Sequence, residues 1–294
     1  QGVHHGRLCA DILHALREAA PDCFSAVRYL LVEPFARLRR EQSRTLRPYA
    51  ASVEWRDSVE ALEPFTGVQL SNELIDAFPV HLIEGNGEVW QERYVGYERA
   101  GFVFTTGLLS SGALEARVSL IPRPLPPGYR TEVSLAALAW PRTLATTLRR
   151  GYLLAFDYGY SRADYYAPER RHGTLSACSK HRREPDPLAR PGEIDLSAHV
   201  DFTSLVEAAE QAGFRLAGFT DQHHFMVGVG RLSFADRTEL TPAHEQELRA
   251  FKMLMHPGLM GLSFKVLCLD KGLGSGSAPA GFSLAGDPRR ALGL

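Results

Sequence analysis

The first residues of the chain have the types and spacing of a turn that holds a nucleotide-type ligand. Gly2 and Gly6 stand four positions apart, and an amphipathic run over residues 8–19 predicts a helix behind them. Glycine lets the backbone approach a ligand and adopt a positive φ, and the amino end of a helix directs N–H groups at it. Glu33 ends the next apolar run, where its carboxylate could accept hydrogen bonds from the two hydroxyls of a ribose.

Each of these features also has an ordinary structural explanation. A glycine turn occurs in many connections between a strand and a helix, so the spacing of Gly2 and Gly6 is a weak signal by itself. A carboxylate that follows an apolar run needs a partner. For Glu33 that partner could be a ribose or an arginine of the following segment. The candidates for such a salt bridge are Arg37, Arg39 and Arg40.

Strand-like and helix-like segments alternate along the first 79 residues. The run AVRYLLVEPF predicts a buried parallel strand. Further predictions are a helix at 35–46, strands at 52–55 and 67–72, and helical turns at 58–62 and after Asn72. This alternation is typical of βαβ units and a parallel sheet. The predicted fold class is therefore α/β, with ligands bound beyond the carboxyl ends of the strands.

The first strand of such a sheet would lie directly before Gln1. That strand is central, and without it two rows of backbone N–H and C=O groups would lack partners. Each lost pair costs about 1–3 kcal/mol, whereas a folded domain has about 5–15 kcal/mol of net stability. We therefore expect the natural protein to have more residues upstream, with an apolar strand just before Gln1.

The middle of the chain has a different pattern. Residues 80–120 carry turn signals, such as GNG at 85–87, between alternating residues, which predicts antiparallel hairpins. The proline-rich stretch 121–130 predicts a connector that is neither helix nor central strand. A helix is predicted at 133–148, and the run GYLLAFDYGY predicts a strand that ends at Asp157.

A polar stretch at 161–192 separates this strand from the last elements. A loop of this length predicts a functional lid or a disordered segment, and its basic cluster at 180–183 predicts a solvated face. Beyond it we predict a helix capped by Asp201 or Thr203, a strand at 214–222, a helix from Thr241 or Pro242, and a final strand at 264–272.

These patterns divide the chain into four parts. Residues 1–79 would form the cofactor half of an α/β domain, and residues 80–130 a hairpin insertion with its connector. Residues 131–272 would complete the domain and include the polar loop 161–192. Residues 273–294 are rich in Gly, Ser, Pro and Ala, which predicts a disordered tail.

Composition excludes several classes of function. The 294 residues carry a net charge of −1, which gives no general electrostatic case for binding nucleic acid or an anionic membrane. No apolar run approaches the length of about 18 residues that suggests a membrane-spanning helix. The four cysteines and the two histidine pairs have no metal-ligand spacing, so we predict no metal and free thiols in the cytoplasm.

Several blocks of the sequence resemble the MidA family of S-adenosylmethionine-dependent methyltransferases. They are QLSNELIDAFPVHLI, AFDYGY, HGTL and PGEIDLSAHVDFTSLVEAAEQAGF, in the family's order. The resemblance implies a class I methyltransferase fold with a seven-stranded, mostly parallel sheet whose last strand, here FKVLCLDKG, is antiparallel. It also implies S-adenosyl-L-methionine as the cofactor. For the mitochondrial member of the family, it implies methylation of arginine in a subunit of respiratory complex I.

The resemblance also assigns site residues. Gly2, His4 and Gly6 fall on the glycine motif, with His4 where a glycine is usual, and Glu33 matches the acid that binds the ribose. Asp57 and Ser58 match the segment that lies against adenine. The motif at the end of the fourth strand, beside the transferable methyl group, corresponds to Asn72, Glu73 and Asp76.

An arginine acceptor is a cation, and carboxylates would have to bind its guanidinium and orient one nitrogen. Glu73 and Asp76 are three residues apart, hence on one side of a helical turn, and are our candidates together with Asn72. Alternatively, Asn72 caps the following turn and the acids are solvated. Glu132 coincides with an acidic position of the family, or it is an acid in the first turn of a helix.

Other polar and aromatic side chains leave two explanations open. Asp157 either lines the pocket or accepts hydrogen bonds from the loop that follows it. Four tyrosines either form the wall of an acceptor pocket or pack at the base of a loop. They are Tyr158, Tyr160, Tyr165 and Tyr166.

The sequence thus predicts a protein arginine methyltransferase with a protein substrate. One alternative is an assembly or binding factor that keeps the fold with little or no catalysis, which His4 in the glycine motif favours. Another is a small-molecule methyltransferase with the same cofactor site. The exposed hairpin insertion would leave room for a homodimer.

Overall fold

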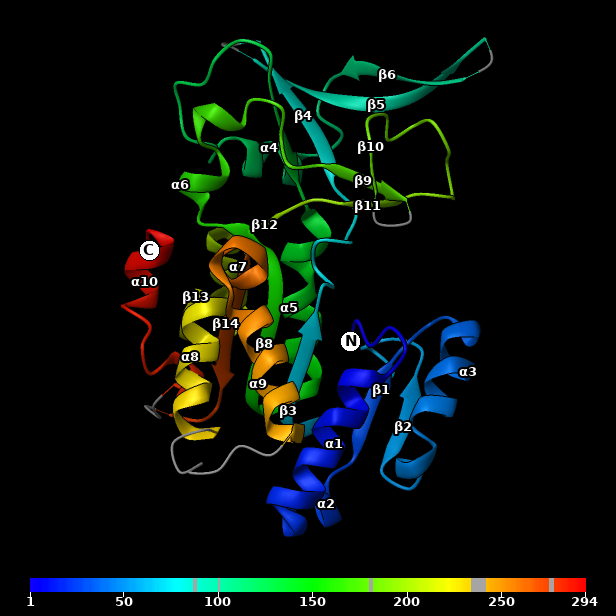
Figure 1. The fold of residues 1–294 in the computed structure, drawn as a ribbon. Coiled ribbons are helices and arrows are strands. Elements are labelled where there is room, and N and C mark those ends of the chain that lie inside the picture. Colours follow the sequence, from blue (N-terminus) through cyan, green and yellow to red (C-terminus); the bar gives the residue numbers. More distant parts are fainter. Residues whose placement is uncertain (87–88, 100, 180–181, 234–241, 275–277) are drawn as a thin grey trace.

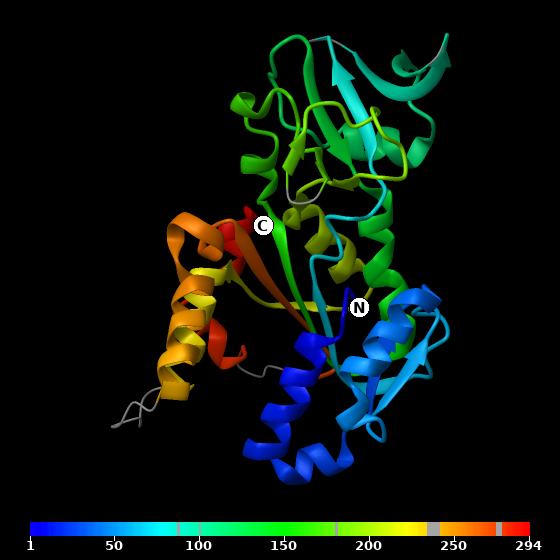
Figure 2. The same ribbon diagram turned by 45° about the vertical axis from the view of Figure 1, so that its right-hand side comes forward.

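The computed structural model describes residues 1–86, 89–99, 101–179, 182–233, 242–274 and 278–294, and for 233 and 242–244 the backbone alone. Some predictions lie outside these residues: the end of the turn at Gly87, the basic residues Lys180 and His181, and a helix start at Thr241. Figures 1 and 2 show an α/β core below and a smaller β-rich insertion above it.

The main sheet of the core has the order β3–β8–β14–β13, with a short strand, β12, beside the end of β8. Strand β3 runs parallel to β8, whereas β14 is antiparallel to both β8 and β13. The prediction of an antiparallel last strand is therefore confirmed. The bounds are β3 (Phe65–Asn72), β8 (Leu148–Tyr160), β12 (Val200–Asp201), β13 (Arg215–Asp221) and β14 (Phe264–Lys271).

Alternating side chains of β14 bury the two faces of this sheet separately. Leu267 and Leu269 pack with helices α5 (Leu135–Thr147) and α7 (Phe202–Gln211). Val266 and Cys268 pack on the other face with Phe225. Phe225 belongs to helix α8 (Gln222–Ser233), which the sequence patterns missed and which contacts α9 (Pro242–Met255). The layers thus follow from the period of two along a strand.

A second, two-stranded sheet lies beside β3. Its strands, β1 (Tyr29–Val32) and β2 (Val53–Arg56), are parallel, as predicted. Helix α1 (Arg7–Ala19) packs against them through Cys9 and Leu13. The amino group of Gln1 donates a hydrogen bond to the Leu70 carbonyl of β3 (3.0 Å). The strand expected before Gln1 stays a prediction.

Short helices complete this part of the core. The predicted helix at 35–46 is α3 (Ala36–Thr45), and α2 (Pro21–Ala26) and the 3₁₀ helix η1 (Arg47–Tyr49) flank the two strands. Residues 58–62 and the segment after Asn72 form turns instead of the predicted helical turns.

The insertion is an antiparallel sheet of order β6–β5–β4–β7. Hairpins were predicted here, and β4 (His81–Gly85), β5 (Trp90–Glu98) and β6 (Gly101–Gly107) confirm them. Helix α4 (Gly112–Val118) was missed. The proline-rich stretch 121–130 was predicted to contain no central strand, and strand β7 (Tyr129–Val133) begins at its end. No proline lies within β7, and its backbone pairs with β4. In Figure 1 this sheet lies above the carboxyl ends of β3 and β8.

The polar stretch 161–192 carries more secondary structure than the sequence predicted. It contains α6 (Arg162–Tyr165), the 3₁₀ helix η2 (Pro168–Arg170), β9 (Ser176–Ser179) and β10 (Arg182–Glu184). Strand β9 pairs with both β10 and β11 (Asp195–Ser197). In this small sheet the backbone N–H and C=O groups of the polar stretch find partners in other strands, one of which, β11, lies beyond the stretch, so the local sequence pattern did not predict it.

The predicted disordered tail is wrong for the described residues after 277. The 3₁₀ helix η4 (Ala280–Phe282) places Phe282 against Phe225, and α10 (Pro288–Leu292) buries Leu292 in the main core. Asp287 caps α10 by accepting hydrogen bonds from the N–H groups of Arg289 and Arg290. A few large apolar residues thus outweigh the Gly/Pro-rich composition.

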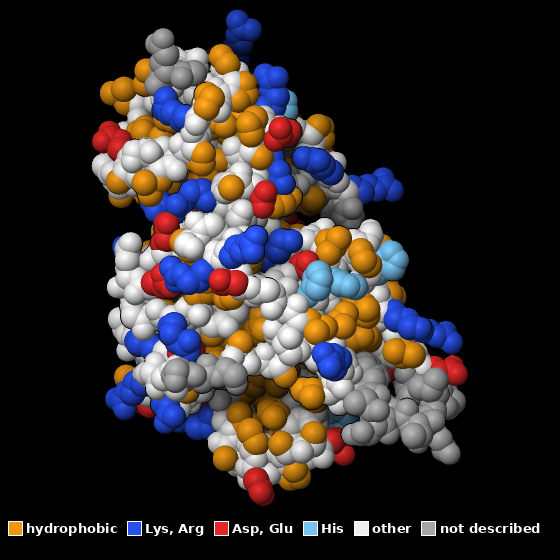
Figure 3. Space-filling view, turned by 90° about the vertical axis from the view of Figure 1, so that its left-hand side faces the viewer, with side chains coloured by type: hydrophobic (Ala, Val, Ile, Leu, Met, Phe, Trp, Pro, Cys, Tyr) orange, Lys and Arg blue, Asp and Glu red, His pale blue; other side chains and the backbone are white. Residues whose placement is uncertain are grey.

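Two observations on the described residues concern membrane spanning and the distribution of surface charge. Among the described residues, no helix has the length and apolar character needed to cross a bilayer. Figure 3 shows basic and acidic side chains interspersed with hydrophobic ones on one face. This mixture agrees with the net charge of −1.

Candidate functional site

The amino-terminal turn lies against the carboxyl end of β3. Gly2, His4 and Gly6 all have positive φ angles, of 68°, 46° and 81°. A Cβ atom on Gly2 would lie 2.6 Å from the Asn72 carbonyl oxygen, so only glycine fits there without displacement. Gly6 is the residue from which α1 starts. Gly2 and Asn72, predicted as parts of one site, are therefore brought together, whereas Gly6 lies against Leu46 and Gln42.

Glu33 is connected to this turn through one side chain. Its carboxylate is buried, and it accepts hydrogen bonds from the Phe35 N–H and the Gln42 amide (both 3.0 Å). The same Gln42 amide donates to the His4 carbonyl (2.9 Å). Trp55 in turn donates to the Gln42 oxygen (2.9 Å) and fixes the amide's orientation. Gln42 is thus a residue of the site that the sequence patterns missed.

The salt-bridge explanation for Glu33 does not hold among the described contacts. Arg39 pairs with Asp57, and it donates to the backbone carbonyl of Glu33 rather than to its carboxylate. Arg37 pairs with Glu41 instead. Asp57, predicted to lie near adenine, is thereby held next to the end of β1. Its carboxylate remains 81% exposed, and Ser58 follows it in the turn after β2.

The turn after β3 is organised by Asp157. One oxygen of this carboxylate accepts hydrogen bonds from three successive N–H groups, those of Leu74 (3.2 Å), Ile75 (2.8 Å) and Asp76 (3.4 Å). The other oxygen accepts from the Tyr158 N–H (2.9 Å). Asp157 thus fixes the turn after β3, not the loop after its own strand, which continues to Tyr160 rather than ending at Asp157.

The two acids of this turn differ in exposure. Glu73 is exposed, has a φ of 47°, and accepts a hydrogen bond from the Asn72 amide (3.2 Å). Asp76 is buried, and its Oδ1 has no hydrogen-bond partner among the described residues. The alternative that Asn72 caps the next turn and both acids are solvated is therefore wrong for Asn72 and Asp76.

Burial raises the pKa values of the Asp76 and Asp157 carboxyls, and no cation is among the groups that shift them. Desolvation, followed by the charge of Glu73, raises the pKa of Asp76 to about 6. Desolvation and the charge of Asp76 raise the pKa of Asp157 to about 7. The neighbouring Tyr158 phenol has its pKa raised to about 12 by burial and by the same acids. A cation placed beside this cluster would be strongly favoured.

Glu132 is a buried residue of strand β7 and not an acid in the first turn of a helix. One oxygen accepts hydrogen bonds from the Thr174 N–H (2.8 Å) and hydroxyl (2.9 Å), and the other from the Leu175 N–H (3.2 Å). Gly173 packs so closely on this carboxylate that a Cβ atom would overlap it. Burial raises the pKa of Glu132, and these hydrogen bonds oppose the shift.

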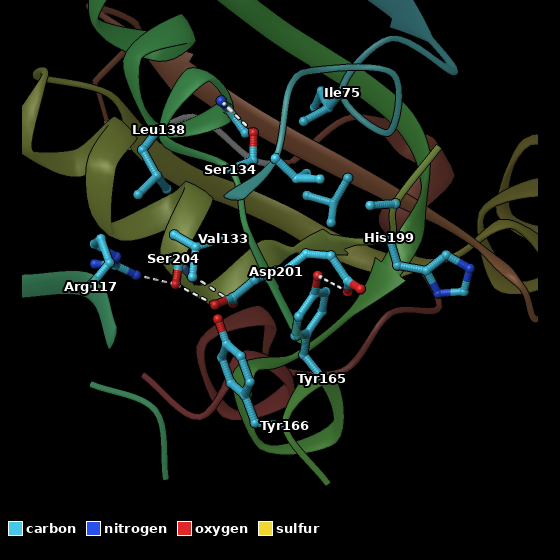
Figure 4. A pocket seen from close by; sticks show the side chains of 15 residues that line it. Ile75, Arg117, Val133, Ser134, Leu138, Tyr165, Tyr166, His199, Asp201 and Ser204 are labelled. Carbon is cyan, nitrogen blue, oxygen red and sulfur yellow. Dashed lines mark hydrogen bonds between the residues drawn. The ribbon is translucent and has the colours of Figure 1, made fainter. Parts of the chain in front are cut away.

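A small cavity of about 30 Å³ lies between Glu132 and the amino end of α7. Figure 4 shows the side chains that line it. Tyr165 and Tyr166 line the cavity, but both are buried and pack in the core of the insertion, so an acceptor pocket at these tyrosines stays a prediction. Asp201 caps α7 through the Ser204 N–H (3.0 Å). Arg117 of α4 donates to the Ser204 hydroxyl and so ties the insertion to the core. The sequence analysis missed Arg117, because its partners are 87 residues away.

His199 belongs to the same cavity wall, but its ring points away from Tyr165 and Tyr166 (Figure 4). The ring lies beside Tyr158 and Tyr160, with centroid distances of 6.1 and 5.2 Å. Burial lowers the pKa of the imidazole. The block DLSAHVDF, used only to support the resemblance, was the available signal for this residue.

The histidine pairs make ordinary contacts. His223 bonds to the Met255 carbonyl (2.6 Å), His224 pairs with Asp221 (2.7 Å), and His5 pairs with Glu41 (2.8 Å). Within the described ranges, no group of three metal-ligating side chains comes together.

Comparison with known proteins now assigns the family. A family model of S-adenosyl-L-methionine-dependent methyltransferases matches residues 2–220. The chain belongs to this family. A crystal structure from Burkholderia thailandensis, bound to S-adenosyl-homocysteine, is 33% identical, has a TM-score of 0.84, and is matched over 96% of this chain and 72% of its own. The predicted class I methyltransferase fold is thereby confirmed.

Two curated relatives of this chain are named mitochondrial protein arginine methyltransferase NDUFAF7 homologs. The Drosophila melanogaster protein is 28% identical over 92% of this chain, and the Caenorhabditis elegans protein is 27% identical over 89%. The human NDUFAF7 is 24% identical over 74%. The chain spans 67%, 60% and 48% of the lengths of these three relatives.

Proposed function

We propose that this methyltransferase transfers a methyl group from S-adenosyl-L-methionine to a guanidinium nitrogen of a protein arginine. In that reaction the methyl–sulfur bond breaks as the nitrogen–methyl bond forms, and the guanidinium loses one proton. The cofactor supplies the activated methyl group, so the protein's work is positioning and electrostatics. The observation that carries the proposal is the junction of the Gly2 turn with the acid-rich turn at 72–76.

The residues of the first half fit the cofactor. The Glu33 carboxylate is buried, its hydrogen bonds come from Phe35 and Gln42, and its remaining lone pairs would accept ribose hydroxyls. Gly2, His4 and Gly6 would hold the methionine end, because their positive φ angles form a turn at the start of α1 and Gly2 lies against Asn72. Asp57 and Ser58 would lie against adenine, and Asn72 beside the methyl-bearing sulfur.

The acids at the end of β3 would hold the acceptor. Glu73 and Asp76 would bind the guanidinium, with Asn72 orienting one nitrogen. The unpartnered Oδ1 of Asp76 and the raised pKa values of Asp76 and Asp157 support a cationic acceptor, because its charge would relieve the repulsion between them. The printed names of the relatives support arginine and a protein substrate.

Calorimetry with S-adenosyl-homocysteine tests the cofactor half, using the protein at its natural length. We expect binding, and a folded sample without binding would overturn the proposal. Transfer of labelled methyl groups to protein fractions and to small-molecule fractions then separates a protein acceptor from a small one. Glu73→Gln should retain cofactor binding and lose transfer, whereas unchanged transfer would remove Glu73 from its role.

One observation favours a second candidate, an assembly or binding factor with little catalysis. His4 has a positive φ of 46° at a position where glycine is usual in the family that the sequence resembles. His4→Gly discriminates the two: increased transfer would point to an enzyme, and unchanged partner binding without any transfer would point to the factor. We also propose a cytoplasmic location, which the four free cysteines support. A homodimer is a separate proposal, supported by the exposed insertion.

A further inference from the structure

The sheet of the insertion has one packed face and one open face. The strand registers place Leu82 opposite Arg93 and Glu132, and residues opposite each other point to the same side. The neighbouring residues Ile83 and Val133 point to the other side, where they pack with α4. The open face therefore carries Leu82, Glu84, Gln91, Arg93, Val95, Tyr97, Phe102, Phe104, Thr106, Arg130 and Glu132.

A cavity of about 390 Å³ lies over the inner part of this open face. Arg93, Phe104 and Arg130 form one wall, and Leu175 and the segment 185–187 beyond β10 form the opposite wall. Its volume falls in the range that holds a small ligand or a few amino-acid side chains. It is more than ten times larger than the cavity drawn in Figure 4.

The cavity holds a guanidinium that is only partly neutralised. Arg93 is 16% exposed, stacks over the Phe104 ring (4.2 Å), and shares the single carboxylate of Glu84 with Arg130. Burial, followed by the charge of Arg130, lowers the pKa of Arg93, although Glu84 opposes the shift. A carboxylate entering the cavity would complete the pairing.

The other charged groups that line the cavity do not supply that carboxylate. Glu132 is occupied by its hydrogen bonds from Thr174 and Leu175. Asp186 is exposed on the opposite wall and accepts a hydrogen bond from the Leu188 N–H (2.9 Å). His172 lines the same cavity.

Outward from the cavity, the open face becomes an apolar strip. Val95, Tyr97 and Phe102 are 54%, 67% and 46% exposed, and the two aromatic rings contact each other (5.5 Å). Strand β6, which carries Phe102, is paired on one side only among the described strands. Such an edge can accept an extended peptide as a further strand.

Inward, the same face leads toward the acid-rich turn. Glu132 accepts a hydrogen bond from the Thr174 hydroxyl, which in turn accepts from the His199 N–H (3.0 Å). The preceding Ala198 N–H donates to the Asp76 carbonyl (2.9 Å). The cavity and the turn that carries Glu73 and Asp76 are therefore connected by a short, hydrogen-bonded path.

We propose that the open face docks the acceptor protein through an extended segment in which an acidic side chain lies between apolar ones. The acidic side chain pairs with Arg93, and the apolar ones cover the strip at Val95, Tyr97 and Phe102. This inference rests on the proposed function, since it takes a protein as the acceptor.

Three acetylated and amidated nonapeptides with a central Leu-Glu-Leu, Leu-Gln-Leu or Leu-Lys-Leu test the proposal by fluorescence anisotropy. The protein at its natural length, with S-adenosyl-homocysteine present, should bind the Glu peptide about tenfold more tightly than the others, a difference of about 1.4 kcal/mol. Arg93→Gln should remove that preference. Arg149→Gln, an exposed position at the start of β8, should keep it.

Equal binding of all three peptides, no binding at millimolar concentration, or a preference that survives Arg93→Gln would overturn the proposal. Sedimentation adds a further outcome: a dimer that Tyr97→Ser converts to monomers would assign the strip to a second copy and also overturn it. Calorimetry with S-adenosyl-homocysteine on the same samples distinguishes these failures from a failure of the proposed function.

Discussion

At the scale of single residues, the candidate site depends on how each carboxylate is satisfied. Glu33 and Asp157 are both buried, but the first receives one backbone and one side-chain donor from α3 and its N-cap, and the second receives four backbone N–H groups. Asp76 has one buried oxygen without a donor. The first arrangement leaves capacity for a neutral polyol, and the last leaves capacity for a cation.

Glu33→Gln should weaken the binding of S-adenosyl-homocysteine by roughly 10- to 100-fold, because a hydrogen bond to a charged group contributes about 1.5–3 kcal/mol. Titration calorimetry measures the change. Glu63→Gln, at an exposed position in the turn before β3, is the matched control and should leave the affinity unchanged. An affinity that stays within twofold for Glu33→Gln would argue against its contact with the ribose.

The Asp76–Asp157 pair should make stability depend on pH. The folded state raises these pKa values from 3.8 to about 6 and about 7, so it binds protons more tightly than the unfolded chain. The contribution is therefore complete below about pH 4 and is lost as the pH rises through 6 and 7. Asp157→Asn should reduce the loss of unfolding free energy between pH 5 and pH 8 by on the order of 2 kcal/mol.

Urea unfolding at several pH values measures this effect. Asp186→Asn, an exposed carboxylate in the loop after β10, serves as the control and should show the pH dependence of the unmodified protein. Parallel pH profiles for Asp157→Asn and the unmodified protein would contradict the assigned role.

At the scale of elements, the site exists because two turns meet. The loop that starts α1 contributes a glycine against the Asn72 carbonyl, and Asp157 in β8 ties down the residues that follow Asn72. Each turn alone would be an ordinary connection. The parallel pairing of β3 and β8 places the end of β3 beside Asp157, and the hydrogen bond from Gln1 to the Leu70 carbonyl holds the amino-terminal loop against β3.

Comparing Gly2→Ala with Gly128→Ala separates the effect of the Gly2–Asn72 contact from the backbone strain of a positive φ. At Gly2 the new Cβ meets the Asn72 carbonyl oxygen, whereas at Gly128, also at positive φ, it meets open space. Both substitutions should cost about 1 kcal/mol of stability through backbone strain. Only Gly2→Ala should also weaken cofactor binding, by tenfold or more, as measured by calorimetry. Equal effects of both variants on binding would contradict the proposed contact.

At the scale of the whole molecule, the ends of the chain take part in the fold. Gln1 contacts β3, and Leu292 of α10 is 1% exposed within the main core. The insertion is tied to the core through Arg117 and Ser204. We thus propose that the insertion sheet docks the acceptor and that the core carries out methyl transfer, with the Arg117–Ser204 hydrogen bond joining the two.

Leu292→Ala should lower the free energy of unfolding by about 2–5 kcal/mol, the usual cost of a cavity in a packed core. Leu284→Ala, at a position that is 40% exposed in the same tail, should cost less than about 0.5 kcal/mol. Denaturant unfolding of both variants measures the difference. A negligible effect of Leu292→Ala would support the disordered tail that composition predicted.

The sequence by itself determined the α/β class of the fold and the positions of many strands along the chain, and it proposed Gly2, Gly6 and Glu33 as candidate residues. Those features depend on local periodicity and on the special conformations of glycine, which neighbouring residues encode. Only the tertiary structure decided that Gln42 joins Glu33 to the turn, that Asp157 fixes the segment after β3, and that the open face carries Arg93 beside Phe104. These contacts join residues far apart in the chain, and burial decides which polar atoms are left without partners.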